Sequence, residues 1–459
     1  MDKKMKTFIK QSRIPESAAK VFAWHARSGA LQRLTPPWER IKIIDQSGGI
    51  EPGAQNIFKI YQGPIPIVWH AEHREYKENR LFQDVQLKGP FSFWKHTHHF
   101  IPDGDHACLM EDHIEYQLPG DPIGPFLGDR FVRSKLNKMF DYRHRIVLQD
   151  MKTLAQKPKD MKIIISGASG VIGSALIPFL TTQGHSVVQL VRKHAKQSNQ
   201  TAYWDPQKNE IDSHCVENSD AVIHLAGENI GEGRWTNKKK QSIVQSRTKG
   251  TQLIADTIAK CPSSKRPDIL ISASAIGYYG NRGDQIITES DTPGDMFISY
   301  VCKEWENAAK KILDSGVRVV FLRIGVVLTP SGGALAKLYL PFKSGMGCIM
   351  GSGNQYMSWI ALDDVLGVIS HALYNNKLKG PVNVTSPEPL PHGTFMKTLA
   401  QAMHRPVMLK IPSWVIKGMF GQMGQEVLLS GVRVYPEQLI QTNYSFQFPK
   451  LEQALHHML

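Results

Sequence analysis

Three glycines spaced three residues apart form the clearest chemical motif of the chain. They stand in segment 167–173, which reads GASGVIG, and they are Gly167, Gly170 and Gly173. An apolar run, Lys162–Ser166, precedes the segment, and a helical pattern over 174–183 follows it. In such a strand–turn–helix unit the first glycine makes the tight turn, the second lets the backbone approach a pyrophosphate, and the third lets helix and strand pack closely. The helix start also offers free N–H groups to an anion. We therefore predict a dinucleotide site; a glycine-rich turn without a ligand is the alternative.

The residues at the end of the next apolar run, Ser186–Val191, indicate which dinucleotide is bound. Sites for NAD(H) place an Asp or Glu at this point, where it binds the adenosine ribose hydroxyls. This chain has Val191 instead, followed by Arg192 and Lys193. A carboxylate would repel a 2′-phosphate, whereas a guanidinium can bind it in a fork. We therefore favour NADP(H) over NAD(H); the alternative is that Arg192 merely follows the strand into solvent.

Alternating strands and helices must position these residues. After the linker, short apolar runs alternate with helical patterns, which predicts βαβ units and an α/β Rossmann fold with a doubly wound parallel sheet. The predicted strands are Lys162–Ser166, Ser186–Val191, Ala221–Leu225, Asp268–Ser272 and Arg318–Ile324. Such sheets bind their ligands beyond the carboxyl ends of the strands. The tail from about Pro381 contains several prolines and amphipathic segments, and we expect it to form a small α+β subdomain.

The region before residue 155 has another character. Its predicted strands are Ile41–Ile44, Ile57–Tyr61, Ile67–Tyr76 and Leu81–Leu87, and an amphipathic helical stretch, Leu127–Leu154, closes it. The segment Ala155–Asp160 reads AQKPKD and is typical of a short linker. We therefore divide the chain into an α+β domain over 1–154, a linker over 155–160, a nucleotide-binding domain over 161–380 and a C-terminal, substrate-side subdomain over 381–459.

The composition is that of a folded protein, with 41% apolar and 21% charged residues among 459. It contains no run of eighteen apolar residues, so we expect no membrane-spanning segment. The five cysteines form no CxxC pair, which argues against a disulfide framework or a zinc site and favours a cytoplasmic location. The formal charge of +14 is spread along the chain without a nucleic-acid-binding motif. We interpret it as solvated surface and expect no nucleic acid partner and no metal.

Longer motifs show that residues 162–455 resemble the atypical, extended-type short-chain dehydrogenase/reductases, an epimerase-like family with a C-terminal domain of unknown function. The motifs are Asp220–Ile230, Gly233–Trp235 with Ser246-Arg247, Ser272–Gly280, Ser358–Asp364, Gly380–Pro389, Leu428–Pro436 and Phe446–Pro449. Residues 1–150 resemble the START-like (SRPBCC) helix-grip superfamily, through Ser12–Phe22 and Leu34–Trp38. That second resemblance implies a curved antiparallel sheet around a long C-terminal helix, and a cavity for an apolar ligand.

The first resemblance implies roles for residues near the carboxyl ends of the strands. Ala226 and Gly227 should line the nicotinamide ribose, and Ser274 matches the serine that hydrogen-bonds the reacting oxygen. Arg323 ends a later strand near the substrate side. The residues expected to contact the cofactor are Gly167, Ser169, Gly170, Val171, Ile172, Arg192, Lys193, Leu225, Ala226, Gly227, Ser272 and Arg323.

Typical members of that family also carry Tyr-x-x-x-Lys on the next helix, where the lysine lowers the pKa of the tyrosine that transfers the proton. When this chain is aligned through Glu306, the tyrosine position holds Ile298 and the lysine position holds Cys302. Tyr300 and Lys303 are the runner-up pair, but they are spaced by three. Tyr300 also lies about 200° around the helix from the tyrosine position, so we interpret the pair as a false match.

Other side chains could replace the missing pair. Tyr278 follows Ser274 at the carboxyl edge of the sheet and is the candidate proton donor. Glu228, just past Ala226 and Gly227, is a further candidate substrate residue, and Arg234 and Arg247 could bind an anionic small-molecule substrate. Packing and ion pairing are the alternative roles for all four. Two hypotheses stay open: an NADPH-dependent reductase or epimerase-like enzyme, and a module that binds NADPH and an apolar ligand without turnover, as a sensor or regulator. The sequence leaves the substrate and the oligomeric state unassigned.

Overall fold

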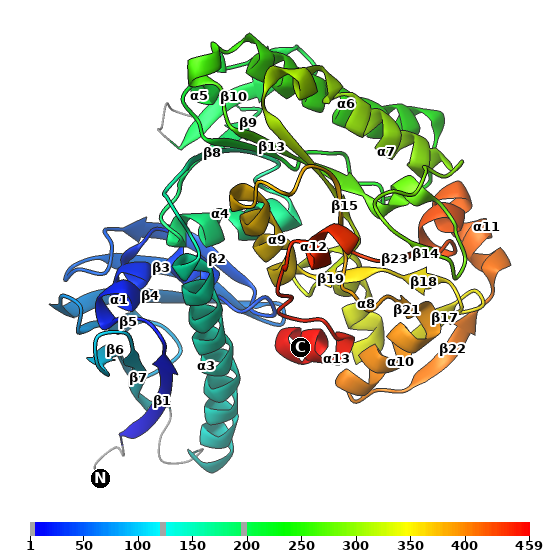
Figure 1. Ribbon diagram of the computed structural model, residues 1–459. Coiled ribbons are helices and arrows are strands. Elements are labelled where there is room, and N and C mark those ends of the chain that lie inside the picture. The colour runs from blue at the N-terminus through cyan, green and yellow to red at the C-terminus, as the bar shows by residue number, and fades with distance from the viewer. Residues whose placement is uncertain (1–4, 120–124, 194–199) are drawn as a thin grey trace. The chain divides into compact units, whose positions relative to one another are not determined.

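The computed structural model describes residues 5–119, 125–193 and 200–459. The chain folds into two compact units. One comprises Met1–Lys157 and Pro178–Gly184, and the other comprises Pro158–Ile177 and His185–Leu459. Figure 1 labels their helices and strands in chain order.

The N-terminal unit is built on a seven-stranded antiparallel sheet with the order β1-β7-β6-β5-β4-β3-β2. Its elements are β1 (Lys6–Ile14), α1 (Ala18–Ala26), α2 (Ala30–Arg33), β2 (Ile41–Ser47), β3 (Gln55–Gln62), β4 (Ile65–Lys77), β5 (Leu81–Lys88), β6 (Phe93–Pro102), β7 (Cys108–Gln117) and α3 (Pro125–Ala155). The four strands predicted here and the long closing helix are confirmed.

The long helix α3 packs on one face of this sheet (Figure 1). The strands alternate between buried and partly exposed residues, because successive side chains of a strand point to opposite faces. On β7 the buried set includes Met110, Asp112 and Ile114. Leu136 and Phe140 of α3 pack against the aromatic side chains of that face.

The second unit contains an eight-stranded sheet with the order β11-β10-β9-β8-β12-β13-β15-β20, in which only β11 pairs antiparallel among the described strands. Its strands are β8 (Lys162–Ser166), β9 (Ser186–Val191), β10 (Thr201–Asp205), β11 (Glu210–Ile211), β12 (Ala221–His224), β13 (Ile269–Ala275), β15 (Arg318–Ile324) and β20 (Gly380–Val384). The connections run outward from β8 on one side and from β12 on the other, which is the doubly wound Rossmann order. The predicted parallel sheet is confirmed.

Helices cover both faces of this sheet. Figure 1 shows α6 (Asn237–Lys260) and α7 (Phe297–Asn307) on one face, and α4 (Val171–Thr182) and α9 (Leu362–Tyr374) on the other. The central strand β8 is therefore enclosed on both sides, and its three isoleucines are fully buried. This enclosure explains why the strand reads as a continuous apolar run instead of an alternating one.

The remaining elements of this unit form short two-stranded sheets that join distant segments of the chain. The pairs are β14 (Ile286–Ile287) with β23 (Arg433–Val434), β16 (Val326–Thr329) with β19 (Trp359–Ala361), β17 (Gly347–Met350) with β22 (Val407–Ile411), and β18 (Tyr356–Met357) with β21 (Leu390–Pro391). The helices are α5 (Ser213–Val216), α8 (Gly333–Lys343), α10 (His392–Ala402), α11 (Ser413–Met423), α12 (Glu437–Gln441) and α13 (Leu451–Met458), with short turns η1 (Ser263–Lys265), η2 (Ile276–Tyr279), η3 (Lys310–Ser315) and η4 (Gly424–Leu428). Segments on both sides of residue 380 thus share the small subdomain, and the main sheet continues to Val384.

A buried carboxylate ties the tail to the Rossmann fold. Asp364, at the start of α9, accepts backbone N–H groups from Gln447 at 2.8 Å and Phe448 at 3.0 Å, and the Tyr444 hydroxyl at 3.1 Å. Burial raises the pKa of Asp364 to about 6, against the opposing effect of these donors. The five cysteines are all free, and no helix in the described part of the chain has the length and apolar character needed to cross a membrane.

Candidate functional site

The glycine segment forms the turn between β8 and α4, at the carboxyl ends of the parallel strands. Gly167 has φ +77°, a conformation that residues with a side chain rarely adopt. A Cβ atom at this position would lie 2.7 Å from the Leu225 carbonyl carbon and 2.8 Å from the Ala226 nitrogen. The turns after β8 and β12 therefore meet at Gly167, which is the point in the sheet where the direction of the connections reverses.

The structure also explains why the other two positions of the segment are glycine. A Cβ on Gly173 would lie 2.2 Å from the Gly167 carbonyl oxygen, so only glycine lets α4 start so close to the turn. The Gly170 N–H donates to that same oxygen at 3.0 Å. Ser169 and Gly170 are exposed, and α4 begins at Val171 and Ile172, which are half-buried. The segment thus has the open backbone turn and helix start that bind a pyrophosphate elsewhere.

Arg192 and Lys193 directly follow β9 and are both exposed. Neither side chain forms a hydrogen bond or ion pair with any described residue. Both are therefore available to a ligand on this side of the glycine turn, and equally to solvent. Their role as cofactor contacts stays a prediction.

The loop after β12 brings together three of the residues predicted to bind cofactor or substrate. The Leu225 N–H donates to the Ser166 carbonyl at 3.2 Å, so the loop starts beside the glycine turn. Arg247 of α6 is buried, and it donates to the Glu228 carbonyl at 3.0 Å. The Glu228 carboxylate in turn pairs with Lys239 at 2.6 Å. Charges at Glu228 and Arg247 thus already have partners within the fold.

Arg234 lies away from these two residues. Its guanidinium donates to the carbonyl of Met419 at 3.0 Å and to the carbonyl of Gly418, both on α11. It therefore holds α11, and a direct substrate contact stays a prediction. His224, in β12, is fully buried, and its Nδ1 lies 2.6 Å from the Ser166 hydroxyl. Burial, with Arg247 nearby, lowers the pKa of His224 to about 3, so the ring is a neutral core residue.

Ser274 stands opposite Arg323 in the register of β13 and β15, and Glu306 of α7 joins the two. The Ser274 hydroxyl donates to Glu306 Oε1 at 2.8 Å, and Arg323 binds both carboxylate oxygens at 2.9 Å. Because its only hydrogen goes to Glu306, Ser274 can accept a hydrogen bond from a substrate in this arrangement but cannot donate one. Ser272, two residues earlier, is buried in the strand.

Arg323 also binds the tyrosines that follow Ser274. Its guanidinium donates to the Tyr279 hydroxyl at 2.9 Å, which donates onward to Asn383 at 2.6 Å. Burial disfavours the charged form, but Glu306 and Tyr279 outweigh it and hold the pKa of Arg323 above its ordinary value. For Tyr279 the effect of burial is opposite: it disfavours the phenolate and raises the pKa of the hydroxyl, although Arg323 acts to lower it. Arg323 is therefore fixed by protein groups, and its expected contact with the cofactor stays a prediction.

Tyr278 differs from its neighbour Tyr279. Its ring is half-buried and lies against the Arg323 guanidinium, 3.5 Å from the ring centroid. No hydrogen-bond partner of its hydroxyl occurs among the described residues. Of the two tyrosines, Tyr278 is therefore the one whose hydroxyl remains available to a ligand.

Helix α7 shows what replaces the family's usual tyrosine and lysine. Ile298 lies close to Gly277, where an added Cβ would come within 2.7 Å of its side chain, and Cys302 is buried. Burial raises the pKa of the Cys302 thiol to about 12, so it is an inert core residue. Tyr300 is 53% exposed and Lys303 is exposed as well. The runner-up pair therefore occupies the outer face of the helix.

Two glutamates that the sequence did not single out as functional organise this region. Glu306 bonds to both Ser274 and Arg323. The sequence offered one clue to this role, which is the position of an acidic residue one helical turn after the buried Cys302. Glu426 of η4 accepts the backbone N–H groups of Phe297 at 3.4 Å and Ile298 at 3.0 Å. It thereby caps the start of α7 from the C-terminal segment, a contact that no local sequence pattern reveals.

The N-terminal unit contains a partly open cavity of about 700 Å³ between its sheet and α3. Apolar and aromatic side chains dominate its lining, among them Phe58, Trp69, Phe91 and Leu136. Polar groups gather at one part of it, including Asp84, His96, His98 and Arg143. The cavity has the size and lining of a small-molecule site.

Comparison with known proteins identifies the class to which this fold and site belong. Residues 163–385 match the NAD dependent epimerase/dehydratase family, and residues 411–458 match a domain of unknown function. The epimerase family protein Mb2239 of Mycobacterium bovis is 38% identical over 293 residues, which cover 64% of this chain and 96% of that protein. The chain therefore belongs to the epimerase family.

Two solved structures extend the likeness. The nucleoside-diphosphate sugar epimerase from Corynebacterium glutamicum is 30% identical with a TM-score of 0.81. The match covers 98% of this chain and 90% of the Corynebacterium chain. The human epimerase family protein SDR39U1, solved with NADPH, is 33% identical with a TM-score of 0.60. The match covers 65% of this chain and 99% of the human chain. The first of these includes a counterpart of the N-terminal unit.

Proposed function

We propose that the Rossmann unit binds NADP(H) and acts as an epimerase- or reductase-like enzyme on a small molecule. The observation that carries this proposal is the glycine turn between β8 and α4, whose exposed backbone at Ser169 and Gly170 precedes a helix start, with the exposed Arg192 at the end of the neighbouring strand β9. The glycine turn, the loop 225–227 and Ser272 would hold the cofactor along the carboxyl edge of the sheet. The related human structure with NADPH supports the choice of the phosphorylated dinucleotide.

In the proposed reaction, a hydride passes between nicotinamide C4 and a carbon of the substrate, and a proton passes between Tyr278 and the attached oxygen. NADPH and a proton thereby reduce a carbonyl to an alcohol, and the reverse step oxidises the alcohol. Ser274 would accept a hydrogen bond from the hydroxyl form of the substrate. Glu306 is a positioning residue, because it orients both Ser274 and the arginine beneath Tyr278.

Replacing Arg192 with alanine tests the cofactor assignment. A charge-assisted hydrogen bond contributes about 1.5–3 kcal/mol, so the variant should bind NADPH on the order of tenfold or more weakly and leave NADH affinity nearly unchanged. Thermal shift and calorimetric titration with both cofactors measure this, because a ligand that binds the native state raises the unfolding temperature. Arg266, whose guanidinium bonds backbone carbonyls at the far end of the sheet, is the control position. Equal losses for both cofactors in Arg192→Ala would contradict the assignment.

Replacing Tyr278 with phenylalanine tests the proposed proton donor. Loss of a general acid lowers turnover by about 10²–10⁴, whereas NADPH affinity should not change. The measurement is NADPH oxidation with a panel of aldehydes, ketones and sugars. Tyr300→Phe is the matched control, because this tyrosine is exposed and should be dispensable. Equal activity of the Tyr278 variant and the unmodified protein would exclude the role; no oxidation by either would favour the binding module without turnover.

We further propose that the N-terminal unit is a START-like domain that binds an apolar ligand. The sheet with a long closing helix and the cavity of about 700 Å³, lined mostly by apolar side chains, support this. Extraction of the purified protein with organic solvent, followed by mass spectrometry, tests it. We expect a co-purifying apolar molecule, and its loss when a bulkier side chain fills the cavity, as in Ala71→Phe. A cavity that takes up no apolar probe in either protein would refute the proposal.

A further inference from the structure

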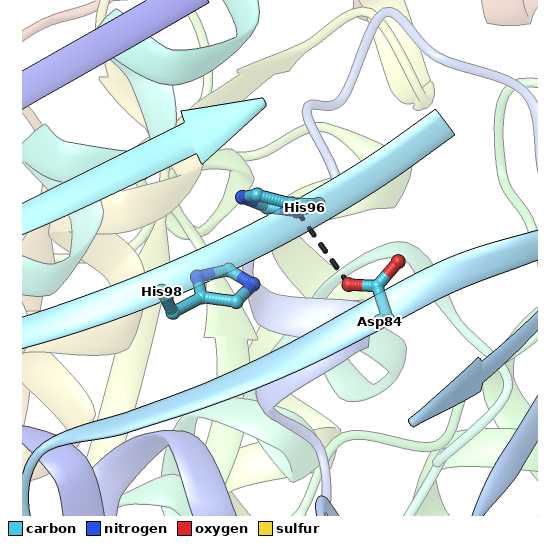
Figure 2. Close-up of side chains that lie close together, drawn as sticks. All are labelled: Asp84, His96 and His98. Carbon is cyan, nitrogen blue, oxygen red and sulfur yellow. Dashed lines mark ion pairs between the residues drawn. The ribbon is translucent and has the colours of Figure 1, made fainter. Parts of the chain in front are cut away.

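A cluster of one carboxylate and two imidazoles lies in the cavity of the N-terminal unit. His96 and His98 alternate along β6, so both side chains point to the same face of the sheet. Asp84 of β5 is the direct cross-strand partner of His96. One ligand atom from each of these residues lies within 4.8 Å of the others, and Figure 2 shows the three side chains around a common space. All three line the cavity.

A fourth residue fixes both rings. Asp112 of β7 accepts His96 Nε2 at 2.8 Å and His98 Nδ1 at 2.6 Å. A neutral imidazole carries one ring proton, so the nitrogen that donates to Asp112 leaves the other nitrogen as a lone pair. His96 Nδ1 and His98 Nε2 are therefore unprotonated acceptors. A carboxylate that accepts the N–H of the second ring nitrogen is one of the usual partners of metal-binding histidines.

The spacing of the cluster fits a metal ion better than a hydrogen bond. His96 Nδ1 and Asp84 Oδ1 are 3.6 Å apart, which is too long for a hydrogen bond. Two ligand atoms that are each about 2.1 Å from a tetrahedral metal lie about 3.4 Å from one another. Among the described residues, no donor lies within hydrogen-bond distance of the Asp84 carboxylate. The hydrogen bonds of both imidazoles thus go to Asp112, and Asp84 faces His96 without a hydrogen-bond donor among the described residues.

We propose that Asp84, His96 and His98 bind one divalent transition-metal ion, with at least one coordination position open to the cavity. Two histidines and one carboxylate form the ligand set of zinc and non-haem iron(II) sites that keep positions for an exogenous ligand. The open position faces an apolar cavity whose lining also includes Arg143, so it suits the oxygen atom of an otherwise apolar molecule. This site replaces the expectation from the sequence that the chain binds no metal, and it does not depend on the cofactor.

A second cluster provides an internal control. His99, Glu111 and His113 are half-exposed and lie on β6 and β7, on the opposite face of the sheet, since His99 and His98 are adjacent. Among the described residues, no single carboxylate accepts hydrogen bonds from both of these histidines, as Asp112 does from His96 and His98. Replacement of His99 therefore removes one imidazole from a cluster of similar composition, and it changes no residue that lines the cavity.

The test uses the full chain, stripped with a chelator and titrated with Co²⁺ and Zn²⁺. We expect one tight site per chain, with the visible absorption bands of Co²⁺ bound in the protein, and Zn²⁺ competing for the same site. Asp84→Asn and His98→Ala should each weaken binding at least about a hundredfold, whereas His99→Ala should not change it. Asp84→Asn decides the question if His98→Ala fails to fold. No saturable binding by the unmodified chain, or a loss caused by His99→Ala and not by Asp84→Asn, would overturn the proposal.

Discussion

Replacing Glu306 with alanine should lower the free energy of unfolding by about 3–5 kcal/mol, because the change leaves a buried cation without its carboxylate. Arg323 is 3% exposed, and the Glu306 side chain is only 12% exposed. Both carboxylate oxygens bind the guanidinium at 2.9 Å, and one of them also accepts the Ser274 hydroxyl. Because both side chains are largely buried, the loss should exceed that of an ordinary surface ion pair.

Urea denaturation of the full chain measures this effect, and Glu304→Ala on the same helix is the matched control. Glu304 accepts one long hydrogen bond, 3.4 Å, from Asn307, and its replacement should change stability by less than about 0.5 kcal/mol. The double variant Glu306→Ala with Arg323→Leu should recover part of the loss, because it removes the orphaned charge. Similar stabilities for the Glu304 and Glu306 variants would show that the ion pair contributes little.

Replacing Gly167 with alanine should abolish measurable NADPH binding and also destabilise the Rossmann unit. The positive φ alone costs about 1–2 kcal/mol for a residue with a Cβ. The added atom would in addition lie 2.7–2.9 Å from three backbone atoms of Leu225 and Ala226. These atoms cannot move without displacing the loop after β12, which forms the other side of the proposed pyrophosphate site.

Gly283→Ala separates the two contributions. Gly283 also has a positive φ, +59°, but a Cβ there would meet no atom within 4 Å. It should lose stability through backbone strain alone and keep its NADPH affinity. If Gly167→Ala bound NADPH as tightly as the unmodified protein, the glycine turn would not be the cofactor site.

The regular elements of both units followed from local patterns in the sequence. Lys162–Ser166 is a continuous apolar run because β8 is covered on both faces, and Leu127–Leu154 has the periodicity of a helix. The roles of the glycines in segment 167–173 were also predictable, because a strand–turn–helix unit needs small residues at these positions of its own turn. Such signals need no knowledge of the rest of the chain.

The side-chain network was not predictable, because its members meet only through the fold. Ser274, Glu306 and Arg323 come from β13, α7 and β15, and the sequence separation between neighbours gives no indication of the contact. The strand register was also needed to bring Asp84 opposite His96. The alternation of His96 and His98 was visible in the sequence, but a pair of histidines on one strand is too common to indicate a metal without its third ligand.

Calorimetric titration of the unmodified full chain with NADPH and, separately, with NADH decides whether the glycine turn binds the phosphorylated dinucleotide. We expect one NADPH site per chain and an affinity for NADPH on the order of tenfold or more above that for NADH, because Arg192 offers a phosphate a charge-assisted hydrogen bond. Equal affinities would contradict the preference for the phosphorylated cofactor. The absence of saturable binding by either cofactor would contradict the assignment of the glycine turn itself.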